Sequence, residues 1–169
     1  MIKIRKVKKN DIDSITYIES KCFPASEAAS KGDIEDRLLV FPNHFFIAQL
    51  NDEVVGFVNG LVSNEKSISD DMYEIATLHN ENGKYQMIFG LDVLPKYRGQ
   101  GIAHQLMQAI INSAKEEGRN GVVLTCKYEL ISFYEELGFK NRGISKSIHG
   151  GVIWYDMELT FINFNDKLH

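Results

Sequence analysis

The 169-residue sequence has little cysteine and proline and no excess of positive charge. Its two cysteines, Cys22 and Cys126, stand far apart and form no CxxC pair, which is typical of buried thiols in a reducing compartment. With 13 glycines and 3 prolines it is not a low-complexity chain. Nineteen basic against 23 acidic residues provide no positive field for a phosphate backbone, so we expect no nucleic-acid partner.

The sequence also lacks a long hydrophobic run. No stretch approaches about 18 consecutive apolar residues, the length that spans a membrane. The basic residues between Met1 and Lys9 are not followed by the apolar segment of a signal peptide. We therefore expect a cytoplasmic protein with no membrane partner. A chain of this length can bury a sufficient core without disulfides or a metal, and we expect no metal site.

Helical and strand periodicities alternate along the chain without a linker or an internal repeat. This predicts one domain over residues 1–169 and a mixed α/β sheet with helices on its faces. The polar, acidic segment 63–83 is predicted to be a long loop, either functional or merely solvated. The expected strands are 1–7, 45–50, 54–62, 85–93, 121–126, 139–144 and 152–160, and the expected helices are about 10–22, 32–39, 101–117 and 130–137.

The segment from Leu91 to Ala103 is the most informative part of the sequence. A strand ends at Pro95, and the chain enters a helix through Gly99 and Gly101. Backbone N–H groups at such a turn can approach an anion closely, at the positive end of the helix dipole. A plain tight turn would show the same glycines. Neither GxxxxGK[ST] nor GxGxxG is present, so the anion would belong to another kind of nucleotide-diphosphate ligand.

Two motifs in this order resemble the GNAT superfamily of acyl-CoA N-acyltransferases. Arg98, Gly101 and Ala103 match its pyrophosphate loop, R/Q-x-x-G-x-G/A. The sequence FYEELGF at 133–139 is similar to the FYEKLGF segment of the same superfamily. Within the superfamily, the strings at 77–79 and 124–126 look most similar to the arylalkylamine N-acetyltransferase branch.

The resemblance implies a GNAT-like fold with six to seven mostly antiparallel strands and about four helices. It implies that strand 86–93 and strand 121–126 form a central parallel pair that splays apart, with the pantetheine arm of acetyl-CoA in the gap. A backbone N–H near Leu91 would polarise the thioester carbonyl. The cofactor-binding residues implied are Leu91, Asp92, Val93, Arg98, Gly99, Gln100, Gly101, Ile102, Ala103 and Phe133.

Tyr134 matches the general acid of the superfamily. A phenol with an ordinary pKa of about 10 stays protonated at neutral pH and can donate to a departing thiolate. The alternative is that Tyr134 only packs behind the motif, because Phe133 and Phe139 lie close in sequence.

The sequence offers several candidates for the general base that would accept the proton of the amine. The arylalkylamine branch carries two histidines where this chain has Met87 and Phe89, and neither of these side chains accepts a proton. His79 is the leading candidate because imidazole has an ordinary pKa of about 6.5, although a lone loop histidine is more often solvated. Strand alternation places Asp92 on the face opposite Met87 and Phe89, which makes it a weaker candidate. The other candidates are Asp70, Asp71, Glu74 and His149.

Met87 and Phe89 share one face of their strand and either line an apolar acceptor pocket or belong to the core. We expect direct acetyl transfer from acetyl-CoA to a small amine, aryl-alkyl amines included, in a ternary complex. A protein or peptide N-acetyltransferase and a non-catalytic CoA-binding sensor are the alternatives. The exposed terminal strands also allow a homodimer.

Overall fold

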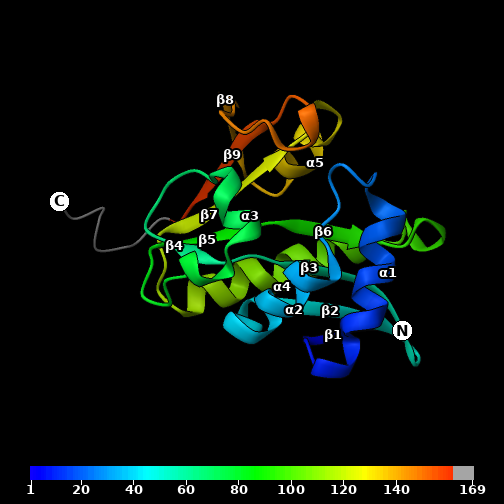
Figure 1. The fold of residues 1–169 in the computed structure, drawn as a ribbon. Coiled ribbons are helices and arrows are strands. Elements are labelled where there is room, and N and C mark those ends of the chain that lie inside the picture. The colour runs from blue at the N-terminus through cyan, green and yellow to red at the C-terminus, as the bar shows by residue number, and fades with distance from the viewer. Residues whose placement is uncertain (162–169) are drawn as a thin grey trace.

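The computed structural model describes residues 1–161, which form a mixed α/β fold, as predicted, with the strands divided between two sheets (Figure 1). The first sheet has the order β1 (Ile2–Lys6), β2 (Phe45–Leu50), β3 (Glu53–Asn59), β6 (Gly90–Val93). The second has the order β4 (Val62–Ser63), β5 (Tyr85–Ile88), β7 (Gly121–Cys126), β9 (Tyr155–Thr160), β8 (Lys140–Ile144). The helices are α1 (Ile12–Cys22), α2 (Lys31–Val40), α3 (Asp70–Glu74), α4 (Ile102–Glu116) and α5 (Ile131–Glu136).

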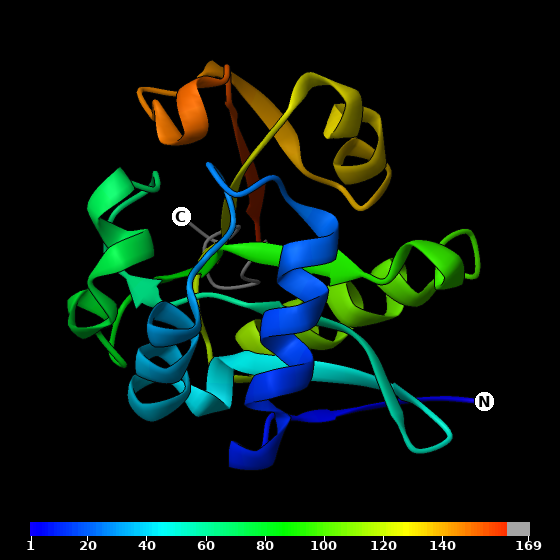
Figure 2. The same cartoon turned by 45° about the vertical axis from the view of Figure 1, so that its right-hand side comes forward.

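Helices cover both faces of the first sheet, with α1 and α2 in front of the strands and α4 behind them in Figure 2. The alternation of β2 accounts for this arrangement, because Phe46 and Ala48 pack in the α4 core whereas Phe45 and Ile47 pack with α1 and α2. On α4 the predicted apolar stripe is buried, and each such side chain contributes about 1.5–3 kcal/mol. In the described part of the chain, no helix is long and apolar enough to cross a membrane.

The described residues form nine strands because two of the expected strands are interrupted where they lie side by side. Strand 54–62 breaks at Gly60, where a Cβ would lie 1.8 Å from the carbonyl oxygen of Met87, so only glycine fits. Strand 85–93 breaks at Phe89. The N–H of Phe89 donates to the Asn59 carbonyl at 2.7 Å, and Gly90 is also the register partner of Asn59. Two residues thus oppose one, as in a β-bulge.

This bulge separates the two sheets. Before it, β5 pairs with β7 in parallel, with Ile88 opposite Leu124, which confirms the predicted parallel pair. After the bulge, β6 pairs with β3 alone among the described strands and forms the edge of the first sheet. The rest of β7 pairs with β9. The facing edges of β6 and β7 therefore diverge, as the resemblance implied.

The bulge also reverses the alternation of side chains. Ile88 and Leu91 face the same α4 core, although they are three residues apart. Phe89 stacks on the guanidinium of Arg37, and Asp92 interacts electrostatically with the same Arg37. The expectation that Asp92 lies on the face opposite Phe89 is therefore wrong, because it assumed an uninterrupted strand.

The acidic segment 63–83 is more ordered than the predicted loop. It contains β4 and α3, and Ile68, Met72 and Ala76 are buried. Asp70 accepts hydrogen bonds from the Ser147 hydroxyl and, at 3.1 Å, from the Ile148 N–H. These bonds fasten α3 to the segment between β8 and β9.

Candidate active site

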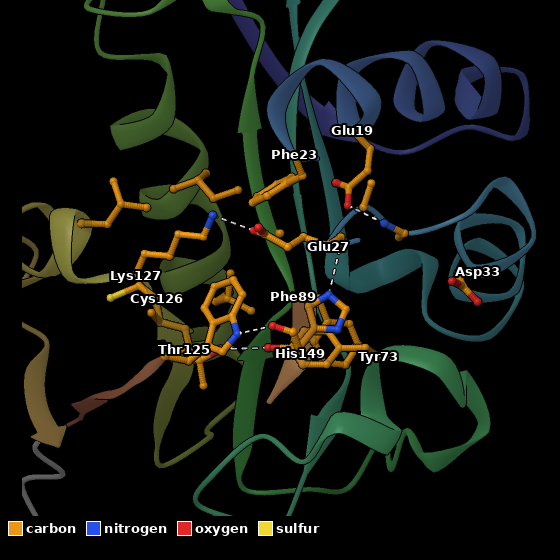
Figure 3. A pocket seen from close by; sticks show the side chains of 18 of the residues that line it. Glu19, Phe23, Glu27, Asp33, Tyr73, Phe89, Thr125, Cys126, Lys127 and His149 are labelled. Carbon is orange, nitrogen blue, oxygen red and sulfur yellow. Dashed lines mark hydrogen bonds and ion pairs between the residues drawn. The ribbon is translucent and has the colours of Figure 1, made fainter. Parts of the chain in front are cut away.

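A cavity of about 250 Å³ opens where the two sheets diverge (Figure 3). Its floor is formed by the end of β5, the start of β6 and the end of β7. The rest of the wall comes from the end of α1 and the segment after it, from α2, from α3, from the start of α5 and from residues near 149–154. The lining includes Glu19, Phe23, Glu27, Asp33, Arg37, Tyr73, Glu74, Phe89, Gly90, Leu91, Thr125, Cys126, Lys127, Tyr134, His149 and Trp154.

Tyr134 lies in the wall on the β7 side of the cavity. Its side chain is buried, and its ring packs edge-on against Phe133 and Phe139 at centroid distances of 5.1 and 5.7 Å. Burial raises the pKa of the Tyr134 phenol, with smaller contributions from Cys126 and Asp92. The ring is packed, as one interpretation predicted, and its phenol stays protonated at neutral pH, which is what the predicted general acid requires. Phe133 itself packs against the core and supports this ring.

Another part of the wall is a bridge from the segment after α1 to the segments after β7 and β8. The carboxylate of Glu27 forms an ion pair with Lys127, with 2.7 Å between Oε1 and Nζ. The Glu27 carbonyl accepts a hydrogen bond of 2.8 Å from His149 Nε2. The His149 ring stacks on Tyr73 at 5.1 Å, as Figure 3 shows. Three separate segments are thus joined across the cavity.

Between these walls lies an aromatic and cationic surface. Arg37 is buried and donates to the Tyr73 carbonyl at 2.9 Å and to Asn59 Oδ1 at 3.3 Å. The Tyr73 hydroxyl forms a 2.9 Å hydrogen bond with Thr125 Oγ1, and burial raises the pKa of Tyr73 to about 12. The predicted pocket residue Phe89 lies here, with its ring 5.0 Å from that of Tyr73.

The glycine-rich turn precedes α4, as predicted. Gly99 and Gly101 both have φ of +80°, and nothing lies within 4 Å of a Cβ added to either. Their backbone is therefore open, next to the N–H groups of the first turn of α4, which have no partner within the helix. Ile102 is buried in the core and fixes this turn, whereas Gln100 is exposed and Ala103 is half-buried.

Arg98 connects the turn to the end of β6. Its Nε donates to the Val93 carbonyl at 3.0 Å, and its Nη2 lies 3.5 Å from Cys22 Sγ. This places the guanidinium beside the last residue of β6, on the sheet edge that β7 leaves. Leu91, Asp92 and Val93 form that edge, and their side chains are half-buried or buried.

Of the residues predicted for catalysis and the acceptor pocket, Tyr134 and Phe89 line the cavity, whereas Met87 and His79 lie away from it. Met87 is fully buried beside Phe41 and Leu61, so the core interpretation holds for it. His79 lies beside His44, and its Nδ1 accepts the Val62 N–H at 2.9 Å. In the neutral ring Nε2 must then carry the proton, which it donates to Glu81 at 3.0 Å.

His79 therefore has no free lone pair for a substrate proton. In addition, burial lowers the pKa of its imidazole. The occupied lone pair depends on the contact of His79 with β4, and the lowered pKa depends on its burial beside His44. The sequence showed only a histidine in a polar segment.

Several lining residues were not predicted from the sequence. Glu19, Glu27 and Arg37 are buried charged side chains, and Tyr73 and Trp154 are buried or half-buried aromatics. A signal for Glu19 was present, because it falls on the apolar stripe of α1 with Ile15, Ile18 and Cys22. A carboxylate at such a position points toward the protein interior.

The family of the chain follows from comparison with known proteins. The family model described as Acetyltransferase (GNAT) family matches residues 12–139. The chain belongs to the GNAT acetyltransferase family. The match covers the bulge and Tyr134, which line the cavity, and the glycine-rich turn before α4.

Relatives of this GNAT chain include N-acetyltransferase family 8 member 2 of Rattus norvegicus, 30% identical over 128 residues, or 73% of this chain and 49% of that protein. The probable hydrolase YhcX of Bacillus subtilis is 29% identical over 132 residues, which cover 72% of this chain and 25% of YhcX. The chain thus spans half or less of the length of these two relatives.

Solved structures share the GNAT fold. The loading GNATL domain of CurA from Lyngbya majuscula aligns with a TM-score of 0.81 at 17% identity, covering 95% of this chain and 98% of that domain. Arabidopsis thaliana Naa50, solved in complex with the bisubstrate analogue CoA-Ac-MVNAL, aligns with a TM-score of 0.72 at 18% identity over 95% of this chain and 99% of Naa50.

Proposed function

We propose that this chain transfers the acetyl group of acetyl-CoA directly to the amino group of a small primary amine within a ternary complex. The observation that carries this proposal is the cavity at the divergence of β6 and β7, with a protonated phenol on one wall and carboxylates on the other. Membership of the GNAT family supports the reaction class.

The residues present fit acetyl-CoA on the side of β6 and α4. The open backbone from Arg98 to Ala103 would hold the pyrophosphate, with the positive end of α4 behind it. The free edge of β6 at Leu91–Val93 would hold the pantetheine arm by backbone hydrogen bonds, with Phe133 supporting the far side. The Leu91 N–H would polarise the thioester carbonyl, and Tyr134 would protonate the leaving thiolate.

The acceptor side favours a small amine. The lining carries four carboxyl groups, from Glu19, Glu27, Asp33 and Glu74, against the two cations Arg37 and Lys127, and this excess of negative charge attracts a cationic amine. Phe89, Tyr73 and Trp154 supply ring surface for an apolar or aryl group, in keeping with the arylalkylamine resemblance. The bridge from Glu27 to Lys127 and His149 crosses the cavity and leaves less room for an extended peptide than for a small amine.

A peptide or protein amine is the second candidate. It is favoured by the fold shared with Naa50, whose structure contains a peptide-like bisubstrate analogue. For such an acceptor the Glu27–His149 contact would have to open. The two candidates therefore differ in one structural requirement that an acceptor panel can test.

The test is release of CoA thiol from acetyl-CoA with 2-phenylethylamine, spermidine and a short peptide with a free N-terminus. We expect turnover with a small amine to exceed that with the peptide. Tyr134→Phe should lower kcat by about 100-fold, the usual size of general-acid catalysis, and leave acetyl-CoA affinity within twofold. Tyr17→Phe, at an exposed tyrosine of α1, is the matched control. Acetyl-CoA binding without thiol release from any amine would instead identify a sensor.

A further inference from the structure

Two buried carboxyl groups meet at the point where β6 begins. Glu19 projects from α1 and is 7% exposed, and Asp92 projects from β6 and is 1% exposed. Glu19 lines the cavity, and its Oε2 accepts the Ala29 N–H at 2.8 Å (Figure 3). Its other oxygen, Oε1, is directed toward Gly90 and Asp92.

Gly90 leaves a small polar space between these carboxyls. A Cβ on Gly90 would lie 3.1 Å from Asp92 Oδ1, 3.6 Å from Asn59 Nδ2 and 3.8 Å from Glu19 Oε1. The φ of Gly90 is not in the left-handed region, so its backbone does not require glycine. Any larger residue would instead fill the space where three polar atoms converge. That space borders the cavity and lies one residue before the proposed oxyanion donor, Leu91.

If Glu19 and Asp92 were both ionised, they would carry two negative charges beside the single positive charge of Arg37. Within residues 1–161 neither oxygen of Asp92 has a hydrogen-bond partner, an expensive state for a buried carboxylate. Burial raises the pKa of Asp92 well above its ordinary value, and the charge of Glu19 raises it further. One proton on Asp92 leaves a single negative charge on Glu19, which the Arg37 guanidinium balances.

We propose that Glu19 accepts a proton from the acceptor ammonium group in the space above Gly90, and that Asp92 is a positioning residue that holds a second proton beside it. This rests on the proposed acetyl transfer. The amine nitrogen then attacks the thioester carbonyl carbon, the C–N bond forms and the C–S bond breaks. Of the three ammonium protons, one remains in the amide and one passes through Glu19 to solvent. The third replaces the proton that Tyr134 gives to sulfur.

Other titratable groups surround the pair and contribute to its pH response. They are Cys22 on α1, Asp33 and Arg37 on α2, and Tyr73 on α3. All four remain in place in the variants described next.

The experiment compares Glu19→Gln, Asp92→Asn and the control Asp13→Asn, which removes an exposed carboxylate from the same helix. The readout is the pH profile of kcat/KM with acetyl-CoA and the best amine of the panel. Glu19→Gln keeps an oxygen for the Ala29 N–H, so the fold should be retained, and thermal unfolding checks this. We expect a loss of at least about 100-fold at neutral pH, with a rate that recovers as the pH approaches the pKa of the acceptor amine itself. An acceptor amine that is already neutral at the assay pH should recover most of the rate.

Asp92→Asn should cost less than about tenfold, because an amide N–H can take the place of the proton that the proposal puts on Asp92. A larger loss for Asp92→Asn than for Glu19→Gln would overturn the assignment of roles. An unchanged pH profile in Glu19→Gln, with an active parent, would overturn the carboxyl pair alone. A parent chain that acetylates no amine would overturn the proposed function and the pair together.

Discussion

The two sides of the cavity are built in different ways. The proposed cofactor side is one continuous segment, 91–103, in which a strand, a turn and the start of a helix follow one another. The proposed acceptor side is assembled from separate segments that contribute Glu19, Glu27, Tyr73, Phe89 and His149. The conformation of one continuous segment can be predicted from its own sequence. A wall made of several segments depends on tertiary contacts between residues far apart in the sequence.

This difference has an energetic counterpart. The proposed cofactor side uses backbone groups, which any sequence of the right conformation supplies, with glycines at φ of +80° as the specific requirement. The acceptor side uses buried charges that are tolerable only in partnership, such as Glu27 with Lys127. A change on the first side should therefore affect CoA binding, and a change on the second should affect the amine.

The largest expected effect follows from Gly101→Asp. A carboxylate beside the proposed pyrophosphate site should weaken CoA binding by at least about 100-fold, or about 2.7 kcal/mol, in isothermal titration calorimetry. Gly118→Asp is the matched control, because Gly118 follows the other end of α4 with φ of +78° and equally free space at its Cβ. Both variants have the same backbone strain, so equal losses of affinity would contradict the pyrophosphate assignment.

The second-largest expected effect concerns the Glu27–Lys127 ion pair and tests whether it excludes peptide acceptors. Lys127→Met removes a positive charge from the lining and leaves the Glu27 carboxylate without its partner, so the KM for the best cationic small amine should fall by up to about tenfold, or about 1.4 kcal/mol. The KM for acetyl-CoA should stay within twofold, and turnover of the peptide should rise relative to the small amine. Lys31→Met, which breaks an exposed pair with Asp13, should change neither. A peptide that remains excluded would show that the Glu27–Lys127 ion pair is not the barrier.

The sequence was sufficient for the fold and for the local motif. The stripe of α4, the crossover between parallel strands and the positive-φ glycines before α4 all follow from short-range patterns, and the structure contains them. The bulge at Phe89 did not follow, because it is set by the pairing of Phe89 and Gly90 with a single residue of β3. One extra residue in a strand reverses the facing of those after it. For this reason Asp92 was assigned to the wrong side.

The smallest expected effect separates two residues that strand alternation had grouped together. Phe89 borders the cavity and stacks on Arg37, with 4.9 Å from the guanidinium carbon to the ring centre, whereas Met87 is enclosed by Phe41 and Leu61. Phe89→Leu should raise KM for 2-phenylethylamine about threefold, or about 0.6 kcal/mol, and should affect spermidine less, because the aryl contact is lost.

Met87→Leu conserves volume in the core and should leave both amine constants unchanged, at a stability loss below about 1.5 kcal/mol. Thermal unfolding and initial rates with the two amines measure these effects together. If Met87→Leu altered the amine KM as much as Phe89→Leu, the core packing of β5, and not the ring surface of Phe89, would govern acceptor binding. The aryl preference of the acceptor side would then lose its structural basis.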